Sequence, residues 1–234
     1  MDLQLRKDES IMETMRVYSR QHENSIYELA NQGVITNKEI YVRLHMAQDA
    51  DFFIQQYRTF VEMAEKHLPK PEGVEFPIWT SIDFKGARHP EPNSVLYAID
   101  VPKDQIIIFD GMKWDYVLNL LYLPQDDTDK QAYLKELKRL GIESEYFLSD
   151  PKNRGRYPEL EKKIKESWMR IFDITDSHPM HLQGNLWQIQ RDWVKGVIHF
   201  GEPVVESDSM TFDLAQEVER VQANQAARQG ESHS

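Results

Sequence analysis

The sequence predicts an α+β fold, namely a single domain with a mixed or antiparallel sheet, helices packed around it and flexible termini. Apolar residues recur every second position in some segments, which is typical of strands, and every three to four positions in others, which is typical of helices. Along the chain these segments follow the order strand, helices, strands, helices, strands. This segregation favours α+β over a doubly wound parallel sheet. The 234 residues are 40% hydrophobic and 11% aromatic, which is enough apolar material for one sizeable core.

Six segments are expected to form strands. Alternating residues predict the first strand over 15–21, with one face made of Arg, Tyr and Arg. Residues of the segment 74–85 also alternate between two faces with a period of two, which predicts a second strand. Pro77 indicates that the beginning of this strand lies at a sheet edge or a bulge. The segment 105–109 is apolar on both faces, which favours a central strand. The other strands are expected over 95–101, 182–189 and 194–200.

Five segments are expected to be helical. A short helix begins at Asn24 or Ser25 and ends at Gly33. A longer helix begins at Asp49 or Asp51, because apolar residues then recur at steps of four, three, four and four. The remaining helices are expected over 113–123, 128–140 and 158–172.

The chain is expected to divide into three parts. Residues 1–14 form an N-terminal extension, 15–201 form the single globular α+β domain, and 202–234 form an acidic, mobile C-terminal tail. The tail carries seven acidic and two basic residues. Its few apolar side chains predict a frayed or partner-dependent helix instead of a core element.

Composition excludes several classes of protein. The 28 Lys and Arg residues against 39 Asp and Glu residues give a formal net charge of −11, which argues against generic binding of duplex nucleic acid. Because the chain has no cysteine, it has no disulfide framework, thiolate zinc site or cysteine nucleophile. We expect a cytoplasmic protein without a membrane segment, since no stretch of about 18 apolar residues occurs.

One short segment, DITDSHPMH at 173–181, concentrates possible metal ligands. Its two aspartates and two histidines could hold Zn, Mn or Fe. The segment lies between a predicted helix and a predicted strand, where Asp and Ser are ordinary turn residues, and Pro179 separates the histidines. We therefore expect no metal site there.

The basic loop KNRGRY contains the candidate phosphate-binding residues Arg154 and Arg156. Guanidinium groups match phosphate geometry, and the start of the following helix would add its dipole. The alternative is a solvated loop, which is the usual setting of exposed Arg and Lys.

Polar and aromatic residues on three predicted strands are candidates for a ligand site. If these strands are neighbours, the residues could line one cleft that takes a small molecule or a protein partner. The alternative is that helices cover these faces and that the tryptophans belong to the core. The candidates are Arg16, Tyr18, Trp79, Ser81, Asp83 and Gln183.

The segments MRVYSRQ, EGVEFPIWTS, VPKDQIIIFDGMKWDYVLNLLYLP and QGNLWQIQRDWVKGVIHF, with the helix that ends at Gly33, occur in order between Met15 and Phe200. In this combination the chain resembles a family of uncharacterised bacterial proteins known as a domain of unknown function. That resemblance implies no particular activity.

More distantly, the order of these motifs is similar to the ADP-ribosyltransferase superfamily, which binds NAD in a split sheet. The resemblance implies that Arg16 or Tyr18 contacts the dinucleotide, that Ser81 lies in the nicotinamide pocket, and that Gln183 occupies the late-strand position. NAD is the cofactor implied in this way.

The sequence departs from that superfamily at the late strand, which usually supplies or closely precedes a glutamate. The neutral amide of Gln183 cannot stabilise developing positive charge as a carboxylate does. Catalysis would then require Asp83 or Asp110, or the domain would bind a nucleotide without turning it over. The sequence therefore predicts a non-catalytic module that binds a small ligand or a protein, with an ADP-ribosyltransferase-like enzyme carrying a degenerate late-strand motif as the alternative.

Overall fold

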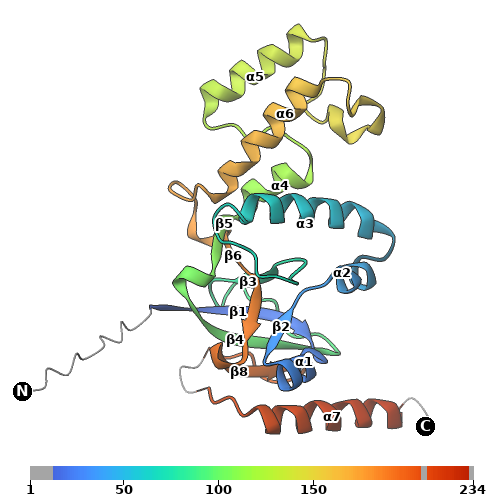
Figure 1. The fold of residues 1–234 in the computed structure, drawn as a ribbon, viewed down its shortest axis with the longest axis vertical. Coiled ribbons are helices and arrows are strands. Elements are labelled where there is room, and N and C mark those ends of the chain that lie inside the picture. Colours follow the sequence, from blue (N-terminus) through green and yellow to red (C-terminus); the bar gives the residue numbers. More distant parts are fainter. Residues whose placement is uncertain (1–12, 207–209, 232–234) are drawn as a thin grey trace, which may run out of the picture. The chain divides into compact units, whose positions relative to one another are not determined.

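A computed structural model describes residues 13–206 and 210–231. Helices and antiparallel strands make up the chain, so the predicted α+β class is confirmed (Figure 1). The described residues divide into two compact units, made of residues 13–35, 82–106, 189–206 and 210–231 (unit 1) and residues 36–81 and 107–188 (unit 2). The single domain over 15–201 stays a prediction. The expectations for residues 1–12, 207–209 and 232–234 lie outside the described residues.

Three antiparallel strands form the sheet of unit 1, in the order β1 (Thr14–His22), β4 (Ser94–Pro102) and β8 (Val194–His199). All three lie where periodicity predicts them. Tyr18 is opposite Ala98, and Ala98 is opposite Gly196, so these residues share one face of the sheet. The short strands β2 (Val34–Thr36) and β7 (Gln188–Gln190) form a separate two-stranded sheet.

Two helices cover the face of this sheet that carries Tyr97 and His199. Helix α1 (Ser25–Gln32) ends at Gly33, whose φ of 74° and N–H···O bond to Leu29 of 3.0 Å match the predicted left-handed cap. The hydroxyls of Ser25 and Tyr97 are 2.9 Å apart. Helix α7 (Leu214–Glu231) packs against α1 within the segment for which a mobile tail is predicted (Figure 1). Its mobility stays a prediction.

The opposite face of the same sheet carries Tyr18, and it is packed. Tyr18, Leu96, Ala98 and Ile198 form a buried cluster with Ala87. Three half-buried side chains outside the strands contact this cluster, namely Phe84, Val204 and Met210. This face is therefore largely apolar, although the residues that β1 places on it are Arg16, Tyr18 and Arg20.

The sheet of unit 2 has the order β5 (Ile107–Asp110), β6 (Leu182–Leu186) and β3 (Ile78–Ser81). The central position expected for 105–109 is wrong, because β5 is at the end of this order and is buried by helices instead of by flanking strands. The strand expected over 74–85 is only four residues long, since the backbone turns after Ser81. The strand expected over 182–189 divides at Trp187.

Five α-helices belong to unit 2 among the described residues. Four of them match predicted segments, and the predicted helix 158–172 continues as a 3-10 helix, η5 (Trp168–Phe172), after its first ten residues. The fifth was not predicted. The helices are α2 (Glu39–Met46), α3 (Ala50–Ala64), α4 (Gly111–Leu118), α5 (Asp127–Arg139) and α6 (Pro158–Ser167).

Aromatic rings form the centre of the unit 2 core. Phe60 of α3 contacts Trp79, Phe109 and Trp114, with ring centroids 5.5, 5.2 and 5.3 Å away. Trp79 therefore lies mainly in the core, under α3 and α4. Of the two alternatives that the sequence leaves open for Trp79, a cleft residue or a core residue, the structure favours the core.

Candidate functional site

Arg16 forms an ion pair across unit 1's sheet. It is opposite Asp100 on β4, and its Nε and Nη2 atoms donate to the two carboxylate oxygens, the second over 3.2 Å. The hydrogen bond to Asp100 is the main cause that raises the pKa of Arg16 above its usual value. The guanidinium charge is thus already compensated, so an anionic ligand would have to compete with Asp100.

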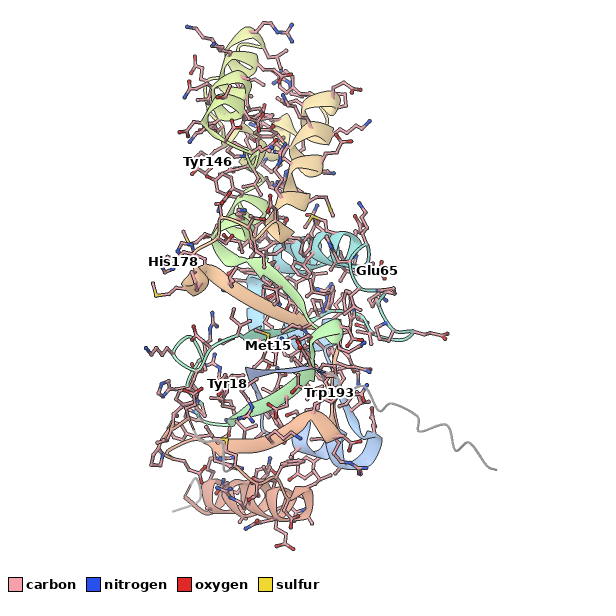
Figure 2. The ribbon with its side chains drawn as sticks, turned by 90° about the vertical axis from the view of Figure 1, so that its left-hand side faces the viewer. Met15, Tyr18, Glu65, Tyr146, His178 and Trp193 are labelled. Carbon is pink, nitrogen blue, oxygen red and sulfur yellow. The ribbon has the colours of Figure 1, made fainter. Side chains whose placement is uncertain are left out.

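Tyr18 belongs to the core of unit 1. Tyr18, labelled in Figure 2, is 3% exposed. Its ring meets Phe84 edge to face, with ring centroids 5.2 Å apart. Its hydroxyl donates to Glu206 over 3.3 Å. Burial, and then the charge of Glu206, raise the pKa of Tyr18.

Asp83 lies in an exposed turn after β3. Its Oδ1 accepts the N–H of Gly86 over 2.6 Å, the usual arrangement of an Asp that closes a turn. The carboxylate is therefore a structural acceptor in unit 1.

Ser81 and Gln183 lie opposite each other on β3 and β6 of unit 2, and Trp79 lies opposite Asn185. Directly opposed residues of antiparallel strands project from the same face. The structure therefore brings three of the predicted residues, Trp79, Ser81 and Gln183, to one face of this sheet.

The Gln183 side chain lies against the first residue of α4. A Cβ on Gly111 would be 2.8 Å from Nε2 of Gln183 and 3.2 Å from the carbonyl oxygen of His181, so a larger residue would displace the amide. Gln183 is exposed, and its side-chain amide forms no hydrogen bond with any residue that the structure describes. One donor group and one acceptor oxygen are thus available for a ligand.

Asn185 follows two residues later on the same face of β6. It is completely buried, and neither its amide nitrogen nor its amide oxygen has a hydrogen-bond partner among the described residues. A buried polar group without a partner costs about 1–3 kcal/mol. Two side-chain amides with unused hydrogen-bonding capacity therefore lie side by side along β6.

Asp110 fixes the turn beside these amides. Its Oδ1 accepts the backbone N–H groups of Met112 and Lys113 over 2.8 and 3.2 Å, which caps α4. Its Oδ2 accepts the hydroxyl of Ser177 over 2.5 Å. All these bonds stabilise the turn, so the carboxylate is engaged in structure.

The DITDSHPMH segment forms the connection before β6. Oδ1 of Asp173 accepts the N–H of Thr175, and Nδ1 of His178 accepts the N–H of Met180, each over 3.2 Å. Within residues 13–206 and 210–231, no group of three or more acidic or histidine side chains is arranged to hold a metal ion.

Arg154 and Arg156 lie on an exposed loop before α6. Nε of Arg154 donates to the carbonyl oxygen of Leu148 over 3.2 Å, and the Arg156 guanidinium lies 5.9 Å from the centre of the Tyr157 ring. The N–H of Gly155 donates to Glu161 over 2.6 Å. A carboxylate thus occupies part of the position where a phosphate is predicted, and the prediction remains untested.

Gly111 and Ser177 are parts of this site that the sequence did not single out. The Asp-Gly pair directly after an apolar strand was an available signal for a capped turn with close backbone approach. Nothing local to Ser177 indicates its contact with Asp110, because 66 residues separate them along the chain.

Comparison with known protein families gives one match. The model of a domain of unknown function, DUF3841, matches residues 16–195. Searches of curated proteins and of solved structures find no significant match. None of the described helices combines the length and hydrophobicity that a membrane crossing requires. Since the match covers well over half of the sequence, this chain belongs to the DUF3841 family.

Proposed function

We propose that this chain is a non-catalytic binding module and that unit 2 binds a small polar ligand at the face of β3 and β6 that carries Ser81, Gln183 and Asn185. The observation that supports this most directly is the exposed Gln183 amide, which lies against Gly111 without a hydrogen bond to any described residue. The Asn185 amide beside it also lacks partners, but it is completely buried, so Gln183 is the amide that a ligand can reach.

A binding role fits these residues better than a catalytic one. An amide offers hydrogen bonds but is neither a general acid, nor a general base, nor a nucleophile at neutral pH. The nearest carboxylate with a defined role, Asp110, already accepts bonds from two backbone groups and from Ser177. We further propose a cytoplasmic location, since a cysteine-free chain needs no oxidising compartment.

The second candidate is an ADP-ribosyltransferase-like enzyme that uses NAD. It is favoured by the opposition of Ser81 and Gln183 on neighbouring strands and by α1 ending at Gly33. Two features oppose it in the described residues: Arg16 is paired with Asp100, and the late-strand position carries an amide. A protein partner is a further candidate that the sequence alone predicts.

Calorimetric titration with NAD and with ADP-ribose tests the proposal on the full chain. The Gln183→Ala variant should raise the dissociation constant for NAD and ADP-ribose about fivefold to tenfold, because one hydrogen bond to the ligand is lost. The matched control is Gln131→Ala, an exposed glutamine of α5 in the same unit, which should bind as the wild type does.

The same samples are then assayed for free nicotinamide by chromatography. Binding of NAD without nicotinamide release supports the module, and steady release that Gln183→Ala abolishes supports the enzyme. If wild type and Gln183→Ala bind equally, or neither probe binds, this face is not a site for dinucleotides and the proposal is wrong for that ligand class.

A further inference from the structure

The C-terminal end of α5 and the loop that follows it line an open groove of about 630 Å³, which we call the α5 groove. Leu134 and Leu137 of α5 form one wall, and Ile142 and Tyr146 of the loop belong to the other side. This volume lies within the range of about 300–1,000 Å³ that is typical of small-molecule sites.

Backbone hydrogen bonds hold the groove in shape. After α5 the chain reverses at Gly141, which has a φ of 73°, and the N–H of Ile142 returns to the carbonyl oxygen of Leu137 over 2.9 Å. A second turn follows, in which the N–H of Tyr146 donates to the Ser144 hydroxyl over 3.1 Å. The groove is therefore preformed, which lowers the entropic cost of binding.

The charge of the groove is negative. Glu143 and Glu145 both line it, against the single cation Lys138. Neither glutamate forms an ion pair with a residue that the structure describes, and Glu145 is half-buried. A partly desolvated carboxylate attracts a cation more strongly than a fully hydrated one does.

A buried hydroxyl of α5, that of Tyr133, lacks a partner among the described residues. Tyr133 is 1% exposed, its ring stacks on Tyr122 with centroids 4.3 Å apart, and its hydroxyl has no hydrogen bond within the described residues. Burial is the main cause that raises the pKa of Tyr133, followed by the charge of Glu145.

An aromatic ring stands at the mouth of the groove. Tyr146 is 56% exposed, although its neighbours Phe147 and Leu148 are buried (Figure 2). The face of a tyrosine ring attracts ammonium and guanidinium groups.

We propose that the α5 groove is a binding site for a small organic cation, an ammonium or guanidinium group attached to an apolar body. The apolar body would lie on Leu134, Leu137 and Ile142, and the cation would lie between Glu145 and Tyr146. This site shares no residue with the face of Gln183 and Asn185, so it is independent of the function proposed above.

The test uses three ligands with the same phenylethyl body and a cationic, neutral or anionic head group, namely 2-phenylethylamine, 2-phenylethanol and 3-phenylpropionate. Each is titrated into the full chain by calorimetry at neutral pH and low salt. The amine should bind about tenfold more tightly than the alcohol, because only the amine gains the carboxylate and the ring face. The propionate should bind more weakly than either.

Two variants locate the site. Glu145→Gln keeps the shape but removes the charge, and it should reduce the preference for the amine over the alcohol to about twofold or less. Tyr146→Ala should weaken the amine further. The matched control is Glu159→Gln, an exposed glutamate at the start of α6, which should leave all three affinities unchanged.

Equal affinity for the three ligands, no binding of the amine, or an equal effect of Glu159→Gln would overturn the proposal. Because Glu145 forms no ion pair with a described residue, its variant should melt like the wild type, so lost binding would not reflect unfolding. Gln183→Ala should bind the amine normally, which separates failure here from failure of the proposed function.

Discussion

His199 Nε2 lies 2.6 Å from Oε2 of Glu217, and the two side chains are only 4% and 7% exposed. Arg220 donates to the other oxygen of Glu217 over 3.1 Å and also pairs with Glu202. Glu202 in turn accepts the backbone N–H of His199 over 2.9 Å. One polar network therefore joins β8 to α7 within unit 1.

Glu217→Ala should lower the free energy of unfolding by about 1–3 kcal/mol, because it leaves the buried His199 imidazole without its partner, while the half-exposed Arg220 keeps Glu202. Urea unfolding followed by tryptophan fluorescence measures the change. Glu219→Ala, at an exposed position on the same helix, is the control and should shift stability by no more than about 0.5 kcal/mol. Equal effects of the two variants would show that the buried pair does not stabilise the fold.

Truncation after Glu206 should destabilise unit 1 more than Glu217→Ala does. The truncation also removes Val221, which is 1% exposed, and the bonds from Gln225 and Arg228 to Glu23. Loss of one buried aliphatic side chain costs about 1.5–3 kcal/mol in addition to the polar bonds. Thermal unfolding by circular dichroism should therefore show a clearly lower midpoint. An unchanged midpoint would support the mobile tail that composition predicts.

Local periodicity was sufficient for much of the fold. The helix over Ala50–Ala64 and the strands of unit 1 follow from patterns of apolar residues, and Gly33 ends α1 as its conformational freedom predicts. The edge position of β5 could not be read in this way, because an apolar run on both faces is equally compatible with burial by strands and burial by helices.

The candidate site, like the fold, could be predicted only where local alternation of residues decides the structure. Alternation along β3 and β6 puts Ser81 and Gln183 on faces that the structure brings together. The same alternation also continues past Ser81 to Asp83, where the chain forms a turn. Composition places Glu217 in an acidic, mobile tail. A charged residue is rarely buried without a partner that compensates it, and the partner His199 is not visible in local sequence.

Gly111→Ala should destabilise unit 2 by about 1 kcal/mol or less, since a new Cβ would lie 2.8 Å from Nε2 at the far end of the exposed, flexible Gln183 side chain, which can move away. The cost should be smaller in a Gln183→Ala background, where only the His181 carbonyl oxygen, 3.2 Å away, remains close. A double-mutant cycle from urea unfolding measures this coupling. Gly230→Ala, where a Cβ meets nothing within 4 Å, is the control and should not destabilise. Additive effects of the two substitutions would contradict the contact between Gly111 and Gln183.

Asp129 should make the stability of unit 2 depend on pH in the acid range. The N–H of Gln125 and the hydroxyl of Tyr122 each donate to its carboxylate over 2.8 Å. The Gln125 bond is the main cause that lowers the pKa of Asp129 below its ordinary value of 3.8.

Because the pKa is lower in the folded state, the unfolded state binds the proton more readily. The stabilisation is thus complete above the unfolded value of 3.8 and is lost as the pH falls through the folded pKa. Asp129→Asn should be less stable than the wild type at neutral pH, and the difference should shrink as the pH falls below 3.8. Urea unfolding over this range measures it, with the exposed Asp127→Asn as control. A difference that stays constant with pH would mean that the carboxylate contributes through packing and not through its charge.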